Sequence, residues 1–472
     1  MLIDRDLLKD IRDSKLTIHC HKVNITQKKL DDGVELEGYG IIKLNESGGL
    51  LLEFICNTLA EFILSGTSIP IDSLDEKQTL FLEAKTIDGH TLTSFGFKIT
   101  PGLHHAITVG KVPYILHIDL LNIENNIQHP YESSDEEYHI ELHFREPCDI
   151  PKNVSNTTES TLGHKEFSWN QTRITQKNYE INIIDHKSHT ELSIRSPKNH
   201  ATLLKNATLF YLGFTSGSYL QPYFEQTIYK KEVKSTILST IKSKSNITIP
   251  PPVSGRVAGS DGKMLDDFHY SILINAIELS HQHPSYFSSL YLHWKRIWHS
   301  FLSDEFSVPM LTLGVAVEGL LNDILIPEMS KHYSNPKLEE EKELIIEKIQ
   351  EIDIKKDHLK SIMKYVERWG NLHPKKCLNI LAEHQIVDSF HVKNWIDLRN
   401  ATAHPKTSKN GESLRKKDIR RTFISLGLFY RLVLYTLHYR GPLFLYRNES
   451  DREIGLIDEL YPELEDTTSS ES

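Results

Sequence analysis

Hydrophobic and polar residues alternate along the first half of the chain in short runs that turn-forming residues separate. Alternation with a period of two is typical of strands that bury one face. The runs are Val34 to Leu44, Thr79 to Ile87, Thr91 to Ile99, Tyr114 to Leu121, Tyr138 to Phe144, Tyr179 to Ile184 and Thr190 to Arg195. Their spacing predicts an antiparallel sandwich or barrel up to about residue 240. The run from Leu50 to Leu64 is ambiguous between strand and helix, and Ala201 to Phe214 has the apolar stripe of a helix.

The period changes to that of helices in the second half of the chain. The predicted helices are Leu265 to Leu279, Tyr286 to Leu302, Pro309 to Ile326, Lys337 to Ile352, Lys356 to Trp369, Ser389 to Ala403 and Arg415 to Tyr439. In the third, Ser307 is a candidate N-cap, and Met310, Leu313, Val317, Leu320, Leu321 and Ile324 form a stripe that we expect to face the core. Short connections between these helices predict an antiparallel bundle.

A segment rich in proline and glycine separates the two halves. Asn246 to Lys263 contains Pro250-Pro251-Pro252 followed by three glycines, which is typical of a linker. The prediction is therefore an α+β protein with four regions: a β-rich, sandwich-like domain over residues 1–245, a linker over 246–263, an all-α helical bundle over 264–457, and an acidic disordered tail over 458–472.

Chemistry-bearing residues gather at the end of one predicted helix. Arg399, Asn400 and His404 lie within six residues of one another, and Asn400 and His404 share a helix face because they are four positions apart. Pro405 disfavours helical geometry at His404, so the imidazole should lie near the carbonyl end, which favours its protonated form. A guanidinium, an amide and an imidazole so placed can bind a phosphodiester and transfer protons. Two other Arg-x4-His matches, from Arg195 and Arg368, are interrupted by Pro197 and Gly370.

Charge is unevenly distributed along the chain. The formal net charge is −10, which argues against a general nucleic-acid coat, yet residues 399–421 carry eight basic side chains and two acidic ones. Eight of the 16 arginines lie from Arg399 onward. Basic residues near the motif could bind an RNA backbone: Lys406, Lys409, Arg415, Lys416 and Arg420. A solvated helix face that balances acidic neighbours is an equally common reason for such a run.

Other functional classes lack support in the sequence. There is no Walker-type loop, Gly-x-Gly-x-x-Gly, His-Glu-x-x-His or Cys-x-x-Cys, so we expect no metal and no cofactor. The sequence His19-Cys20-His21 alternates faces if it is a strand, and a structural role is favoured for His373, Cys377 and His384. The four scattered cysteines favour a reducing compartment, and no apolar run is clean enough to cross a bilayer. These features predict a cytoplasmic protein.

Glu318 stands in the middle of an otherwise apolar predicted helix. A buried carboxylate is costly unless it is paired. One interpretation is that Glu318 orients Arg399 from behind, and the other is that it simply faces solvent.

The Arg399-Asn400-x3-His404 signature at a helix end, inside a bundle with an upstream Glu-bearing apolar helix, resembles the HEPN superfamily of metal-independent ribonucleases. A β-rich domain ahead of such a bundle is similar in layout to the ApeA-like branch of bacterial abortive-infection defence. The motif resemblance covers about Leu265 to Arg447. The chain departs from it by an extra helical hairpin before Pro309, and its N-terminal half offers no matching motif.

The resemblance implies cleavage of RNA by attack of the ribose 2′-hydroxyl on its own phosphate, which leaves a 2′,3′-cyclic end. The sequence does not specify the class of RNA, with tRNA and mRNA as the candidates. Arg399 would hold the phosphate, His404 would transfer a proton, and Asn400 would fix the scissile group or the imidazole. The single histidine of the motif supplies one proton-transfer group per chain, so a homodimer is included in the expectation. The N-terminal domain would sense a trigger such as a phage protein or nucleic acid. Two alternatives remain: a catalytically inactive RNA-binding scaffold, and an interaction module that partners a nucleotidyltransferase.

Overall fold

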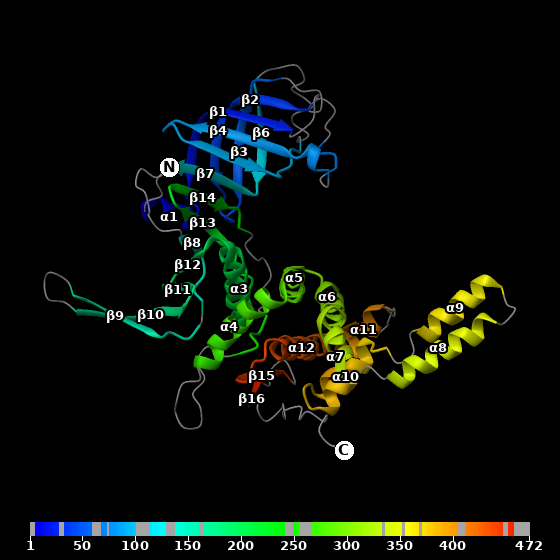
Figure 1. Cartoon of the computed structure of the whole chain (residues 1–472). Helices are drawn as coiled ribbons and strands as arrows, with labels where there is room; N and C mark the ends of the chain where they lie inside the picture. Colours follow the sequence, from blue (N-terminus) through cyan, green and yellow to red (C-terminus); the bar gives the residue numbers. More distant parts are fainter. Residues whose placement is uncertain are drawn as a thin grey trace. The chain divides into compact units, whose positions relative to one another are not determined.

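The computed structural model describes fifteen stretches of the chain. They are residues 5–27, 33–58, 68–72, 75–100, 113–128, 137–148, 150–159, 165–240, 249–253, 266–332, 336–351, 355–367, 371–403, 411–446 and 452–456. The chain forms two compact units (Figure 1). One comprises residues 1–209 and 220–244 and is called the β unit, and the other comprises 210–219 and 245–472 and is called the helical unit. An antiparallel β region followed by a helical region confirms the predicted α+β class.

The β unit contains one continuous sheet of fourteen described strands, all paired antiparallel, rather than two stacked sheets. Their order in the sheet is β6-β3-β2-β1-β4-β5-β7-β14-β13-β8-β12-β11-β10-β9. The bounds are β1 (Thr17–Gln27), β2 (Glu35–Leu44), β3 (Leu50–Cys56), β4 (Leu80–Thr86), β5 (Thr91–Phe95), β6 (Tyr114–Leu120), β7 (Asn122–Gln128), β8 (Glu137–Phe144), β9 (Val154–Glu159), β10 (Lys165–Gln176), β11 (Tyr179–Asp185), β12 (Thr190–Pro197), β13 (Pro222–Tyr229) and β14 (Glu232–Leu238).

The first seven strands of this order curl back on themselves. β6 begins the order and β7 is its seventh member, yet only Leu121 separates the two strands in the chain. A strand that continues from one end of a sheet to the other is how a barrel turns its corner. β3 and β6 alternate buried and less buried residues without a break, so this region has an inner face and an outer face. Of the sandwich and the barrel that the spacing predicted, the strand order favours the barrel.

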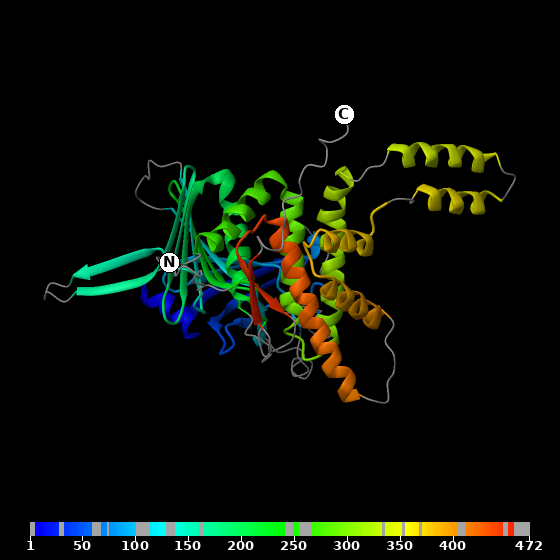
Figure 2. The same cartoon turned by 90° about the horizontal axis from the view of Figure 1, so that it is seen from below.

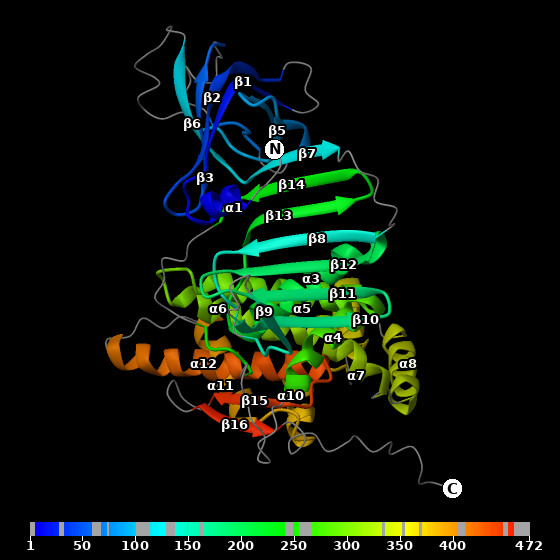
Figure 3. The ribbon, with the colours of Figure 1, turned by 90° about the vertical axis from the view of Figure 1, so that its left-hand side faces the viewer.

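The other half of the sheet is a broad array of strands (Figure 3). β14, β13, β8, β12, β11 and β10 run side by side, and the helix α1 (Arg5–Arg12) precedes the sheet in the chain. The C-terminal carbonyls of α1 accept hydrogen bonds from the guanidinium of Arg145, at 2.9 Å for Ile11 O. The helix α3 (Lys198–Ser216) begins in this unit, where Lys205 binds Glu225 of β13 at 2.8 Å.

The helical unit is a bundle whose helices follow the predicted order. They are α4 (Asp266–Gln282), α5 (Pro284–Ser300), α6 (Ser307–Leu320), a π-helical turn (Leu321–Leu325), α7 (Ile326–His332), α8 (Pro336–Gln350), α9 (Lys356–Glu367), α10 (Pro374–Glu383), α11 (Ser389–Ala403) and α12 (Gly411–Thr436). Figure 2 shows α8 and α9 side by side as a helical hairpin. A short hairpin of β15 (Pro442–Tyr446) and β16 (Arg452–Leu456) follows α12.

Three features of this unit differ from the sequence-based expectations. Ser307 is not the N-cap of α6, because Phe306 holds that position without a side-chain cap and the Ser307 hydroxyl donates to Glu305 instead. The helix α10 was not predicted at all. Residues 249–253, expected in the linker, are held by the helical unit: Tyr430 Oη donates to Pro250 O at 2.7 Å, and the Phe444 amide to Pro252 O at 2.8 Å.

One helical run of the described residues, Ser307–Lys331, is long and apolar enough to cross a membrane. Its most apolar window is 56% buried within the protein. The core helix of a soluble protein has the same properties, and the expected stripe residues Leu313, Val317 and Leu320 are buried here. The structure is compatible with a soluble protein.

Candidate active site

Arg399 and Glu318 form a two-point ion pair between α11 and α6. Arg399 Nε donates to Glu318 Oε2 and Arg399 Nη2 to Glu318 Oε1, each at 2.8 Å. The two residues are 81 positions apart in the chain. The Glu318 carboxylate is therefore paired with Arg399 rather than simply solvated. That it orients Arg399 for a functional role stays a prediction.

The pair depends on close packing of α6 against α11. Trp395 and Leu398 are buried in this interface, and Trp395 Nε1 donates to the carbonyl of Gly314 at 3.2 Å. Gly314 has no side chain, and a Cβ built there would lie 3.9 Å from Arg399 Cα. The backbone of α11 therefore runs close to α6 at Gly314, one turn before Glu318. This close approach fixes the position of Arg399 Cα relative to Glu318.

Arg399 is fixed by its ion pair with Glu318 and is still accessible to solvent. Its side chain is 50% exposed, while that of Glu318 is 29% exposed. A guanidinium has five N–H donors, and Glu318 accepts from two of them, so the pair leaves three for another acceptor. An ion pair so exposed contributes only about 0–1 kcal/mol to folding. The arrangement therefore suits anion binding better than it explains stability.

The remaining members of the predicted motif lie at the end of the same helix. Asn400 is exposed on α11 beside Arg399. The Thr402 hydroxyl donates to the carbonyls of Leu398 and Arg399, at 3.1 and 3.0 Å, in the last turn of the helix. α11 ends at Ala403, as predicted. His404 lies outside the described residues, so its position relative to Arg399 stays a prediction.

The predicted RNA-binding residues are only partly described. Lys416 and Arg420 are exposed on α12. Arg415 lies in the same helix, but its side chain is not described. Lys406 and Lys409 lie outside the described residues. Arg421 was counted in the basic run, but it is largely buried and binds Asp397 of α11 at 2.8 Å. This pair joins α11 to α12, and it was missed because nothing in the local sequence links the two residues.

Neither metal candidate weighed from the sequence forms a cluster among the described residues. Cys20 is buried in β1, while His19 and His21 are exposed on either side of it, as strand alternation predicts. His373 caps α10 by accepting from the Lys376 amide at 3.3 Å, and the buried Cys377 donates to Met329 Sδ at 3.2 Å. The structural interpretation of His373 and Cys377 is supported by these contacts.

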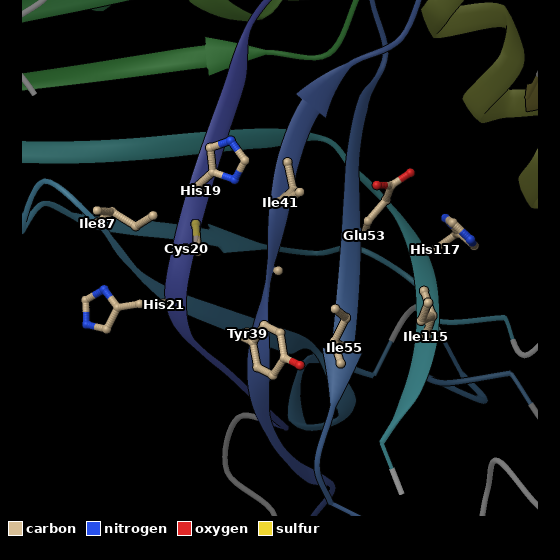
Figure 4. Close-up of a pocket in the computed structure, with 11 residues that line it drawn as sticks. His19, Cys20, His21, Tyr39, Ile41, Glu53, Ile55, Ile87, Ile115 and His117 are labelled. Atoms are coloured by element: carbon tan, nitrogen blue, oxygen red, sulfur yellow. The ribbon is translucent and has the colours of Figure 1, made fainter. Parts of the chain in front are cut away.

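A shallow cavity of about 460 Å³ lies on the outer face of the barrel (Figure 4). One cross-strand row over β1, β2, β3 and β6 is His19, Ile41, Glu53 and His117, and the next row is Tyr39, Ile55 and Ile115. The cavity was missed from the sequence. Its signal was present in the alternation, because these strands carry large apolar residues at outward positions as well as inward ones.

Gly40 of β2 lines this cavity, and Gly38 lies two residues before it on the same strand. A Cβ at Gly40 would lie 2.4 Å from the Glu53 carbonyl, and one at Gly38 would lie 2.0 Å from the Ile55 carbonyl. Only glycine therefore lets β2 and β3 approach so closely. A hydrogen bond from Lys43 lowers the pKa of Glu53, and the charge of His117 acts in the same direction. The single carboxylate of the cavity is thus already paired.

Comparisons with known proteins leave the family of the chain open. No protein-family model, no curated protein and no solved structure matched it.

Proposed function

We propose that the protein is an endoribonuclease that cleaves RNA without a metal ion. The observation that carries the proposal is the two-point pair between Arg399 and Glu318, which holds a half-exposed guanidinium at the end of α11 beside Asn400. A pre-positioned guanidinium is the group that a phosphodiester requires for charge stabilisation in the transition state. The resemblance of the surrounding motif to HEPN ribonucleases supports the same reaction.

In the proposed reaction the 2′-oxygen forms a bond to phosphorus while the bond from phosphorus to the next 5′-oxygen breaks. Arg399 holds the phosphate, and Glu318 keeps the guanidinium in place. His404 transfers a proton, either from the attacking 2′-hydroxyl or to the leaving 5′-oxygen. Asn400 fixes the scissile group or the imidazole. Products are a 2′,3′-cyclic phosphate and a 5′-hydroxyl.

Two proton transfers and only one histidine in the motif of each chain require a second copy of the motif. We therefore propose a homodimer that brings two α11 ends to one RNA strand. The proposed setting is the bacterial cytoplasm, with cleavage of tRNA or mRNA as an abortive-infection response to phage. The β unit would then act as the sensor that restrains the nuclease until a trigger binds.

The test is cleavage of total RNA by purified full-length protein in the presence of EDTA. We expect His404→Ala and Arg399→Ala to lose at least 100-fold in rate. A loss of at least tenfold is expected for Arg399→Lys, which keeps the charge but cannot form the two-point pair, and for Glu318→Gln. Lys393→Ala is the matched control, because Lys393 is an exposed basic residue of the same helix. It should cleave at the wild-type rate.

The results separate chemistry from other roles. Equal cleavage by wild type and His404→Ala would refute the proposal. A loss of rate in Glu318→Gln that is fully explained by unfolding, measured by circular dichroism on the same samples, would refute the positioning role of Glu318. Cyclic ends on the products, detected by their resistance to alkaline phosphatase until opened by acid, would support attack by the 2′-hydroxyl.

A second candidate function is an RNA-binding scaffold without catalysis. The exposed Lys416 and Arg420 of α12 favour it, since a basic helix face binds phosphates without further machinery. The scaffold predicts RNA affinity that falls with salt while no product forms. Replacing Lys416 and Arg420 together would then weaken binding, and Arg399→Lys would leave it unchanged.

A further inference from the structure

Two histidines face each other at the tip of the β11–β12 hairpin. The His186 amide donates to the His189 carbonyl at 2.8 Å, which leaves Lys187 and Ser188 as the turn. The two imidazole rings stack with their centroids 4.1 Å apart and their planes 9° apart. The turn geometry therefore fixes both rings on one face of the hairpin, one residue before β12 begins.

Glu191 adds a carboxylate to the same face. It lies two residues beyond His189 on β12, so its side chain has the same orientation. Glu191 Oε1 lies 3.3 Å from His186 Nε2 and 3.4 Å from His189 Nε2. The carboxylate oxygen is thus shared between two imidazole nitrogens.

These distances are too long for strong charged hydrogen bonds. Such bonds between nitrogen and a carboxylate measure about 2.7–2.9 Å. His186 Nε2 is buried and has no hydrogen-bond partner within the described residues. Zinc binds imidazole nitrogen and carboxylate oxygen at about 2.0–2.2 Å, and a tetrahedron with bonds of this length has edges of about 3.4 Å. The two separations from Glu191 Oε1 match those edges.

We propose that His186, His189 and Glu191 bind a divalent zinc-like cation, with the fourth position open to water. Two imidazoles and one carboxylate are a donor set that zinc prefers. The three ligand atoms lie within 4.8 Å of one another, and this is the one such group found among the described residues. Binding requires the two stacked rings to turn so that both lone pairs point at the ion.

Arg12 is the competitor for this site. Its Nη1 lies 3.0 Å from His189 Nδ1 and 3.3 Å from Nε2. Coordination through Nε2 requires a hydrogen on Nδ1, which cannot accept from a guanidinium. The arginine and the cation therefore exclude each other at His189, and Arg12 must withdraw toward Asp13, which lies 3.5 Å from its Nε.

The test uses untagged full-length protein, stripped with EDTA and dialysed, and titrated with Zn²⁺ by calorimetry. We expect one saturable site per chain in wild type. His189→Ala and Glu191→Gln should weaken binding at least tenfold, and His19→Ala, which removes an exposed histidine elsewhere in the β unit, should leave it unchanged. Co²⁺ in place of Zn²⁺ should give the visible absorption of a tetrahedral site in wild type and not in Glu191→Gln.

Arg12→Ala tests the competition. Removal of the guanidinium should tighten Zn²⁺ binding at least threefold, and an unchanged or weaker affinity would refute the role of Arg12. The site itself is refuted if wild type shows no saturable binding. It is also refuted if His189→Ala and Glu191→Gln bind as wild type does. Circular dichroism of each variant excludes unfolding as the cause, and Glu191→Gln preserves the shape of the side chain.

Discussion

His269 is a buried histidine in the core of the helical unit, with an exposed fraction of 3%. A hydrogen bond of 2.8 Å joins its Nδ1 to the Tyr211 hydroxyl, and the two rings meet edge to face. Burial lowers the pKa of His269 to about 3. The imidazole is therefore neutral in the folded protein over the whole range in which an exposed histidine titrates.

This histidine should make stability fall in mild acid. The unfolded chain binds the proton near pH 6.5 and the folded chain only near pH 3, so between these values the unfolded state binds more protons. The free energy of unfolding should fall by about 1.4 kcal/mol for each pH unit below about 6. In His269→Gln this component of the slope should vanish, while Tyr211→Phe should keep it. Urea denaturation at pH 7.5 and 5.0 checks this, and equal slopes in wild type and His269→Gln would contradict it.

Individual residues also show which side-chain contacts could be predicted from the sequence and which could not. The pairing of Glu318 with Arg399 was predictable because each residue was out of place locally: a carboxylate in an apolar stripe and an arginine at a helix end. The pairing of Asp397 with Arg421 was not, since both residues suit an exposed helix face. His186, His189 and Glu191 were missed because their meeting depends on a hairpin register that single-residue patterns do not specify.

Helix α6 contains two glycines, Gly314 and Gly319, that differ in the space available for a side chain. A Cβ at Gly314 would make an ordinary contact of 3.9 Å, whereas one at Gly319 would lie 2.3 Å from the His293 ring. Glycine within a helix costs about 0.5–1 kcal/mol relative to alanine. Gly314→Ala should therefore stabilise the protein by about that amount, and Gly319→Ala should destabilise it by about 1–3 kcal/mol through overpacking.

Thermal unfolding of the two variants beside wild type measures both effects, and each variant serves as the control for the other. Destabilisation by Gly314→Ala would mean that α6 and α11 pack more tightly than described. A neutral Gly319→Ala would mean that the His293 ring can move aside without loss.

Elements were predictable where one local signal dominated. α11 was predicted with its observed bounds because its apolar period ends just before Pro405. α10 was missed because it has ten residues and only three buried side chains, Cys377, Leu378 and Leu381. β13 and β14 were missed as well, since their burial comes from pairing with β8 and β7 rather than from a clean alternation of their own.

At the scale of the whole molecule, the proposed chemistry makes activity depend on chain concentration. If two α11 ends form one site, cleavage per chain should fall when the wild-type protein is diluted below the dissociation constant of the dimer. Added His404→Ala chains should inhibit by forming mixed dimers with an incomplete site. Cleavage kinetics over a 1,000-fold dilution, followed by sedimentation at the same concentrations, measure both effects. A constant rate per chain that is indifferent to His404→Ala would contradict the shared site.

Overall organisation was predicted in outline, but the segment of three prolines was misjudged. Proline and glycine content indicates a linker because it disfavours helices and strands. The same residues still offer backbone carbonyls, and the Tyr430 hydroxyl, the Tyr446 hydroxyl and the Phe444 amide donate to three of them in a row. The composition of a segment indicates that it does not form a helix or a strand. It does not indicate whether residues elsewhere in the chain bind the segment in a fixed position.

The path of the chain through α3 has a consequence for genetic dissection. Residues 210–219 belong to the helical unit, where Phe214 packs edge to face against Trp294 and Tyr430, and the chain then returns to supply β13 and β14. No single cut separates one unit from the other. A gene fragment that starts after residue 245 would encode the bundle without Phe214, so a loss of cleavage by that fragment would reflect a damaged core and not the absence of the β unit. A replacement of either unit would have to exchange its interleaved segments together.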